Sequence, residues 1–289
     1  MAEIIIEQEF RIELPGGLNI YRLRRPEVSE EIVRQVGTRF GLSGTVEAGT
    51  FTLNARSISY TERSAWGLQL FRRSGGWQYR DATRWQVDAG QESPRISAEE
   101  AARLALDAIA RSDVAERSEL ALARVRFLHA AQAERGGANH SERIIGARVE
   151  FRRTLDSLFA VGPGGKTVVY LDHERQLTGI DHLWREIEDV HAPVSGLRPV
   201  SEALDEVRRR YAGTDGRVEV TDLQLGYFEL GWDDGQEFLQ PAYVAFLQLS
   251  SPDSRFRMGA VAALPAAVNA PGPVERESRS SEPQPLRSR

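Results

Sequence analysis

A helix-start pattern occurs three times along this chain, and it limits how the chain can fold. In each copy a proline comes two or three residues before a serine, a β-branched residue directly precedes that serine, and at least one acidic residue follows it. The three copies lie at 25–31, 94–100 and 198–204. A serine in this position can accept a hydrogen bond from an unpaired N–H of the first helical turn, and acidic residues suit the positive end of the helix dipole. We therefore predict that Ser29, Ser97 and Ser201 are equivalent N-caps.

The residues after each predicted helix change from a helical to a strand-like pattern. In 149–152, for example, valine and phenylalanine alternate with glutamate and arginine, which predicts a strand with one buried face and one wet face. Each copy thus reads as one helix followed by three or four antiparallel strands, whose sheet buries its apolar face against its own helix. We expect an α+β fold of tandem helix-plus-antiparallel-sheet modules with a disordered C-terminal tail.

The expected modules divide the chain into four parts. They are an N-terminal hairpin with the first helix-sheet module over 1–90, a central module over 94–192, a third module over 197–265, and a disordered tail over 266–289. The hairpin would join 3–14 to 18–23 through Pro15-Gly16-Gly17. The tail is rich in Pro, Ser, Glu and Arg and has few apolar residues, so burial cannot offset its ordering entropy.

Composition excludes several classes of protein. The chain of 289 residues is 41% hydrophobic and 27% charged, as in globular proteins, and its net charge of -5 provides no global field for nucleic acid. The absence of cysteine removes disulfides, thiolate nucleophiles and cysteine-type zinc sites. We expect no cofactor, no nucleic acid partner and no membrane span, since no stretch approaches about 20 apolar residues. The N-terminus has no signal-peptide pattern, so we expect a cytoplasmic protein, or an extracytoplasmic one if an export signal was removed.

The central copy resembles a known family. The run VEFRRTLDSLFAVGPGGKTVVYLD at 149–172, with Trp184-Arg185 downstream, is similar to the PepSY-like modules of bacterial regulatory and protease-propeptide proteins and of YycH/YycI-type two-component regulators. The similarity is best over 97–188. It implies a cystatin-like, non-catalytic module that binds or inhibits proteins.

The run Gly162-Pro163-Gly164-Gly165-Lys166-Thr167 invites comparison with a phosphate-binding loop. That motif needs glycine where Ala160 stands, and a helix must follow it. The residues that follow are strand-forming instead, so we predict a hairpin turn.

Acid–base residues gather in one segment of the central copy. His173 and His182 lie nine residues apart, and Asp172 and Asp181 directly precede them. A spacing of nine would place the two histidines on opposite faces of a continuous strand, so we predict no metal site. If the protein is an enzyme, Asp172, His173, Asp181 and His182 are its candidate acid–base residues.

Several aromatic residues fall near the ends of predicted strands. Our main expectation is that their rings close the sheets over the helices, and a surface lined by some of them would bind a peptide or ligand. The candidates for this binding surface are Trp66, Trp77, Tyr79, Trp184, Tyr227, Trp232 and Tyr243.

These observations favour a non-catalytic regulatory or scaffold protein that binds a protein or peptide, with the partner adding to an exposed sheet edge. One alternative is an enzyme with a pocket on a curved sheet. Another is a structural subunit that assembles through the N-terminal hairpin.

Overall fold

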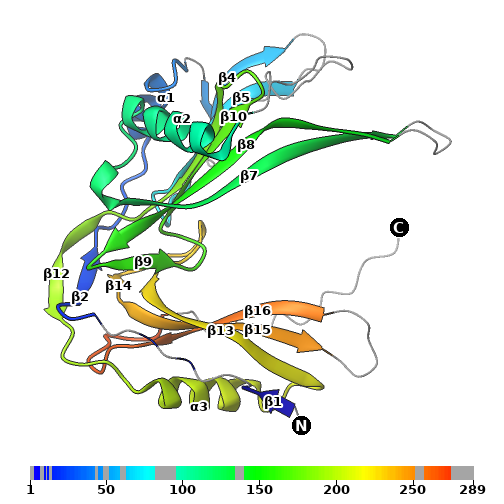
Figure 1. Ribbon diagram of the computed structural model, residues 1–289. Helices are drawn as coiled ribbons and strands as arrows, with labels where there is room; N and C mark the ends of the chain where they lie inside the picture. Colours follow the sequence, from blue (N-terminus) through cyan, green and yellow to red (C-terminus); the bar gives the residue numbers. More distant parts are fainter. Residues whose placement is uncertain are drawn as a thin grey trace, which may run out of the picture. The chain divides into compact units, whose positions relative to one another are not determined.

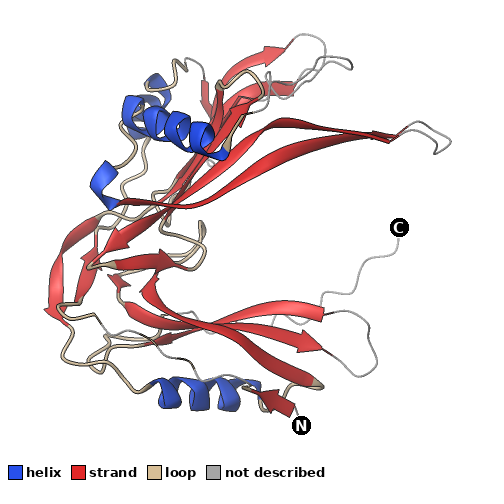
Figure 2. Ribbon diagram, in the orientation of Figure 1, coloured by secondary structure: helices blue, strands red, loops and turns tan. Residues whose placement is uncertain are grey.

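The computed structural model describes residues 3–6, 10, 12, 15–42, 45–47, 52–58, 63–81, 96–133, 140–250 and 257–274. The chain divides into two units, and strands make up most of its regular structure (Figure 2). Unit 1 comprises Met1–Arg22, Asp189–Phe228 and Phe238–Arg289. Unit 2 comprises Leu23–Glu188 and Glu229–Glu237.

Unit 2 is built on one long sheet, in which strands follow the order β9-β8-β10-β11-β6-β5-β4-β3 and β7 also pairs with β8 (Figure 1). Its strands are β3 (Thr45–Glu47), β4 (Thr52–Ile58), β5 (Arg63–Leu70), β6 (Trp77–Asp81), β7 (Leu120–Ala133), β8 (His140–Leu155), β9 (Leu158–Val161), β10 (Lys166–Asp172) and β11 (Leu177–Leu183). The helices α1 (Glu30–Thr38) and α2 (Ala98–Arg111) pack on one face of this sheet, and the short 3-10 helix η2 (Arg117–Glu119) precedes β7. Of the helices that the structure describes, none combines the length and apolarity needed to cross a lipid bilayer.

The expectation of tandem helix-plus-sheet modules is wrong. Strand β6, placed in the first module, pairs antiparallel with β11, placed in the second, so the strands of both belong to one sheet. The helices share a core as well, because Val33 of α1 and Ala105 of α2 are buried in the same apolar cluster. Separate sheets in the first and second modules would expose unpaired backbone groups at β6 and at β11. The pairing of these two strands removes one exposed edge from each sheet.

Unit 1 has a smaller sheet of order β16-β15-β13, with β1 (Glu3–Ile5) added in parallel to β13. Its antiparallel strands are β13 (Arg217–Phe228), β15 (Pro241–Ser250) and β16 (Arg257–Pro265). The helix α3 (Val200–Tyr211) packs on this sheet through Ala203 and Val207. A second, three-stranded sheet has the order β12 (Ile187–Pro193), β2 (Asn19–Leu23) and β14 (Phe238–Leu239).

Both ends of the chain differ from the sequence expectation. The strands β1 and β2 do not pair with each other as a hairpin, because β1 pairs with β13 and β2 pairs with β12 and β14. The expected tail begins too early, since Ala266 and Ala267 are fully buried and Val274 is 4% exposed. The backbone N–H of Arg198 donates to Ala266 O over 2.8 Å, which ties this segment to unit 1. The rest of the expected tail, 275–289, lies outside the described residues.

Local turn chemistry explains how β8 reverses into β9. The two residues between these strands, Asp156 and Ser157, have φ angles of 46° and 66°. Aspartate tolerates a positive φ better than most residues, and two such residues in succession fit the twist of a two-residue hairpin.

Two of the three predicted caps are present. Ser29 accepts a hydrogen bond from Ile32 N over 3.4 Å, and Ser97 accepts one from Glu100 N over 3.0 Å. Ser201 lies inside α3, whose N-cap is Pro199 without any side-chain bond. In this copy the proline directly precedes the β-branched Val200, and the helix begins there. The start is two residues earlier than it would be with Ser201 as the N-cap.

We predict that Ser97→Ala lowers the free energy of unfolding by about 0.5–2 kcal/mol, and that Ser29→Ala has a smaller effect because its bond is longer. Ser201→Ala is the matched control and should leave stability unchanged, because its side chain caps nothing. Urea melts of the three variants measure this, and an equal loss at all three positions would contradict the assignment of the caps.

Candidate binding site

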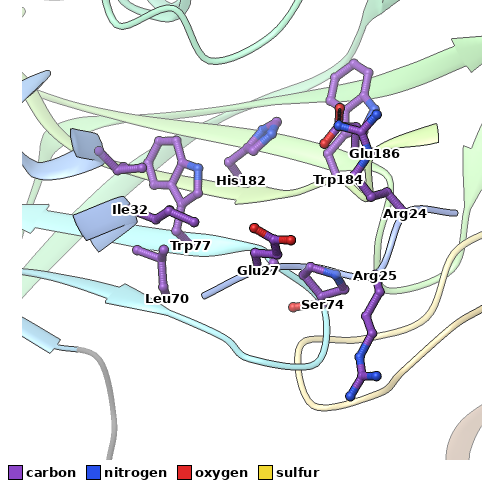
Figure 3. Close-up of a pocket in the computed structure, with 13 residues that line it drawn as sticks. Arg24, Arg25, Glu27, Ile32, Leu70, Ser74, Trp77, His182, Trp184 and Glu186 are labelled. Carbon is purple, nitrogen blue, oxygen red and sulfur yellow. Dashed lines mark hydrogen bonds and ion pairs between the residues drawn. The ribbon is translucent and has the colours of Figure 1, made fainter. Parts of the chain in front are cut away.

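A pocket of about 620 Å³ lies in unit 2, on the face of the sheet that carries α1 (Figure 3). Its walls come from four parts of the chain: the segment 24–27, the helix α1, the turn between β5 and β6 with the start of β6, and the end of β11 with the residues after it. Pockets that bind small ligands or side chains in proteins commonly span about 300–1,000 Å³. The pocket is therefore large enough for a bulky side chain or a small molecule.

Strand pairing places an imidazole between two indole rings in this pocket. In the β6–β11 register Trp77 is directly opposite His182, and their ring centroids are 5.5 Å apart. Trp184 follows two residues after His182, and those two rings lie 5.6 Å apart. Figure 3 shows the three rings in a row along one wall. The pocket therefore presents an aromatic wall, which favours apolar groups with flat faces.

The imidazole of His182 is neutral at physiological pH. Burial lowers its pKa to about 3, and the positive charges of Arg153 and Arg39 act in the same direction. The Nδ1 atom lies 2.9 Å from Thr167 Oγ1, so one ring nitrogen is hydrogen-bonded. Within the described part of the chain, Nε2 has no such partner and can bond to a ligand.

The rim of the pocket is charged but balanced. Arg24 Nη1 lies 2.6 Å from Glu186 Oε1, and the backbone N–H of Arg24 donates to Glu186 O over 2.9 Å. Arg25 and Glu27 are exposed beside them and carry opposite charges. Two arginines and two glutamates give the rim no net charge, so the rim favours polar groups over ions of one sign.

Glycine lets the rim segment approach the turn between β5 and β6. Gly75 has a φ of 71°, and a Cβ at this position would lie 2.9 Å from Pro26 Cβ. Gly76 is equally crowded, since its Cβ would lie 2.8 Å from Leu183 Cδ1 and 2.9 Å from Trp232 Cζ3. The Gly-Gly pair at this turn thus gives the pocket its shape.

A buried ion pair holds the residue next to Trp184. Arg185 and Glu229 are 3% and 0% exposed, and Arg185 Nη1 lies 3.2 Å from Glu229 Oε1. The backbone N–H of Arg185 also donates to Glu229 Oε1 over 2.8 Å, and its guanidinium donates to the carbonyls of Leu230, Gly231 and Asp234. A charge buried this deeply is tolerated only with such partners. The pair fixes the 229–237 segment to the end of β11.

A second arginine supports Trp184 directly. The guanidinium carbon of Arg153 lies 4.8 Å from the centroid of the Trp184 ring, and Arg153 Nη1 donates to Arg185 O over 2.9 Å. A cation over an indole face is an attractive arrangement, and it restricts the ring to one orientation. Sequence reasoning missed Arg153, Arg185 and Glu229 as supports.

The glycine-rich run connects β9 to β10, and a strand rather than a phosphate-binding helix follows it. The predicted hairpin turn is wrong, because β9 and β10 each pair with β8 and not with each other in the described sheet. Strand β10 begins at Lys166, directly after Gly165. A Cβ on Gly164 would lie 2.5 Å from Leu230 O and 2.9 Å from Glu229 Cγ. The glycines thus permit the close approach of the segment that carries the buried glutamate.

The four candidate acid–base residues do not form one site. Asp181 is on the opposite face from His182, where it contacts Arg80 Nη2 at 2.6 Å and Tyr170 OH at 3.0 Å. Asp172 accepts a hydrogen bond from Gln176 N over 2.8 Å in the turn after β10. It lies five residues along the strand from Thr167, the partner of His182, which is about 17 Å.

His173 is buried at the same turn, and neither ring nitrogen has a hydrogen-bond partner within the described part of the chain. It therefore lies at the far end of β10 from the pocket that His182 lines. Among the described residues, no three His, Cys, Asp or Glu side chains are placed to hold a metal ion.

The aromatic residues predicted to line one binding surface do not lie together. Trp77 and Trp184 line the pocket, although Trp77 is as deeply buried as Tyr79, each being 6% exposed. Tyr79 stacks on Phe40, with the ring centroids 4.3 Å apart. Trp232 packs its ring 4.7 Å from Phe71.

The two tyrosine candidates of unit 1 are core residues. Tyr227 and Tyr243 are 0% and 1% exposed, so they do not contribute to a binding surface. The side chain of Trp66 lies outside the described residues. Core packing therefore accounts for the three tyrosines, and two tryptophans lie at the pocket.

Comparisons with known proteins identify no family for this chain. No family model and no curated protein matches it. Among solved structures, the crystal structure of an uncharacterized protein from Eubacterium rectale is similar over 93% of this chain and 88% of that chain, with 11% sequence identity and a TM-score of 0.48. A likeness of this size assigns no activity.

The pKa of His182 predicts how stability responds to acid. The unfolded chain, in which a histidine has a pKa near 6.5, binds this proton before the folded chain does. The contribution of neutral His182 to the stability of the folded state is therefore complete above pH 6.5. It is lost as the pH falls toward 3, at up to about 1.4 kcal/mol of unfolding free energy per pH unit. We predict that His182→Phe removes this part of the slope between pH 6.5 and 5, as measured by urea melts at both pH values. Equal slopes for the variant and the parent would show that the imidazole is not buried in its neutral form.

Proposed function

We propose that this protein is a non-catalytic binding protein, and that a protein or peptide partner inserts an apolar side chain into the unit 2 pocket. The observation that carries this proposal is the neutral imidazole of His182 between Trp77 and Trp184. Aromatic residues in a recessed site supply much of the affinity at protein interfaces, because a large apolar area is buried there.

The chemistry of the walls supports a peptide side chain as the ligand. Leu70 and Ile32 extend the apolar wall beside Trp77, and the charged groups remain at the rim. A peptide fits this division, since its side chain can enter while its main-chain amides bond to the polar rim. The free Nε2 of His182 gives the pocket one directional hydrogen bond.

The arrangement does not support acid–base catalysis by the candidate residues. General acid–base chemistry needs a titratable group within hydrogen-bond reach of the reacting atoms and a pKa near the working pH. His182, whose pKa is about 3, is not protonated near neutral pH, and Asp181 projects from the other face of the sheet. We therefore propose binding without turnover.

Filling the pocket tests this proposal. Peptides selected from a random library on the immobilised protein should carry a large apolar residue that is essential for binding. Ile32→Trp on α1 should fill the pocket and weaken a selected peptide by about tenfold or more. The matched control is Gln35→Trp, which places the same side chain on an exposed position of the same helix and should leave affinity within about twofold.

Titration calorimetry gives the affinities, and mass spectrometry of the peptide after incubation detects turnover. Equal binding by both tryptophan variants would contradict the pocket as the site. Cleavage or modification of the peptide that is lost in His182→Phe would contradict a non-catalytic role.

A further inference from the structure

The face of the unit 2 sheet that points away from α1 and α2 carries an excess of positive charge. Alternation along the strands places six cationic side chains there, which we call the basic face: Arg80, Arg124, Arg126, Arg148, Arg152 and Lys166. The acidic residues Glu150 and Asp181 lie among them. Since the whole chain has a net charge of -5, this local excess is not a consequence of composition.

Like charges are paired directly across strands on this face. Arg126 of β7 is opposite Arg148 of β8, and Arg152 of β8 is opposite Lys166 of β10. Directly opposed like charges destabilise a sheet. Local features that oppose folding are expected at functional sites, where the arrangement serves binding.

The acidic residues neutralise only part of the basic face. Glu150 lies 3.0 Å from Arg148 and 3.1 Å from Arg152, and Asp181 lies 2.6 Å from Arg80. Within the described part of the chain, no carboxylate forms an ion pair with Arg124, Arg126 or Lys166. Lys166 interacts electrostatically with Glu150 and Asp181, so the two cations that remain for a partner are Arg124 and Arg126, and both are exposed.

Those two arginines lie on a strand whose second edge is unpaired in the described part of the chain. Strand β7 is 14 residues long and pairs with β8 and with no other described strand (Figure 1). Its register is regular between two bulges, from Arg124 to Leu128. An edge of this kind presents unpaired backbone N–H and C=O groups that can bond to another strand.

We propose that an acidic, extended segment of a partner protein adds as a strand to the free edge of β7, with alternate carboxylates beside Arg124 and Arg126. Side chains on one face of a strand recur every two residues, about 6.8 Å apart, so the carboxylates of the partner match the spacing of the two arginines. The main-chain bonds supply affinity, and the charges select the partner. This surface is on the opposite face from the pocket, so it can bind whether or not the pocket does.

A protein segment fits this surface better than a nucleic acid. A phosphate backbone has no N–H and C=O ladder to pair with a strand edge. The basic face also offers few free aromatic rings for base stacking, because Tyr170 lies under Arg80 at 4.6 Å.

Fluorescence polarisation with a short, dye-labelled peptide of alternating Glu and Val tests the charge requirement. We expect saturable binding that Arg126→Glu weakens by about tenfold. Arg209→Glu is the matched control, because it makes the same charge change at an exposed position of α3 in unit 1, and it should stay within about twofold. A peptide of alternating Lys and Val should not bind. Equal loss in both variants, or tighter binding of single-stranded oligothymidylate than of the acidic peptide, would overturn the proposal.

Methylation of the peptide backbone tests strand addition separately. In an extended strand the N–H groups of successive residues point to opposite edges, so methylation of either the Glu or the Val amides blocks one edge. We expect one of these two methylated peptides to lose binding and the other to keep it. If both bind as the parent does, the attraction is electrostatic only and strand addition is wrong.

Stability separates a binding role from a structural role. Arg126→Glu places a carboxylate opposite Arg148, which should raise the melting temperature by about 2 °C while affinity for the acidic peptide falls. If both the melting temperature and the affinity fall, Arg126 serves the fold and the proposal is overturned. Arg124→Glu provides a second variant for the same pair of measurements.

Discussion

The pairing of β6 with β11 is the contact on which the architecture of unit 2 depends. Arg80 and Asp181, which form an ion pair across it, are 101 residues apart in the sequence. The pairing joins β3–β6 to β8, β10 and β11, so that α1 and α2 cover one continuous sheet. It also sets the register that places Trp77 opposite His182. The pocket therefore exists because these two strands meet in this register.

The two faces of this sheet have different chemistry because side chains alternate along each strand. His182 contributes to an aromatic wall with no net charge at its rim, and its neighbour Asp181 joins a charged network on the other face. Buried polar groups hold the first face in place, since Arg185 is bonded to Glu229 and Arg153 lies against Trp184. One sheet thus offers two surfaces, of which one suits an apolar group and the other suits an acidic strand.

Local structure could be predicted from the sequence where neighbouring residues determine it. The caps at Ser29 and Ser97 depend on contacts within a few residues, and the structure has them. The predicted cap at Ser201 was wrong, because its helix begins earlier, directly after Pro199. The prediction of tandem modules was wrong for a different reason. Alternation of apolar and polar residues shows which face of a strand is buried, but it does not identify the strand that pairs with it. Gly179 was one sequence feature that is consistent with the pairing of β6 and β11, because a Cβ at this position would lie 2.9 Å from Tyr79 O on the paired strand.

The candidate site was predicted in part. His182, Trp77 and Trp184 were all candidates from the sequence. However, His182 was grouped with acidic residues, and the two tryptophans were grouped with tyrosines that belong to the core of unit 1. Their common location depends on strand register across about 100 residues, which local patterns do not contain. The supporting residues Arg185 and Glu229 were missed for the same reason, because they are 44 residues apart.

A disulfide cross-link tests the β6–β11 pairing most directly, because the chain has no cysteine to interfere. Gln78 and Asp181 are opposite each other in the register, and Val168 lies one strand further in the same row. We predict that the double variant Gln78→Cys/Asp181→Cys forms an intramolecular disulfide under mild oxidation. The pair Gln78→Cys/Val168→Cys should not, since its Cα atoms are about 10 Å apart and a disulfide needs less than about 7 Å. Failure of the first pair to cross-link, or equal cross-linking of both, would contradict the pairing and the pocket that depends on it.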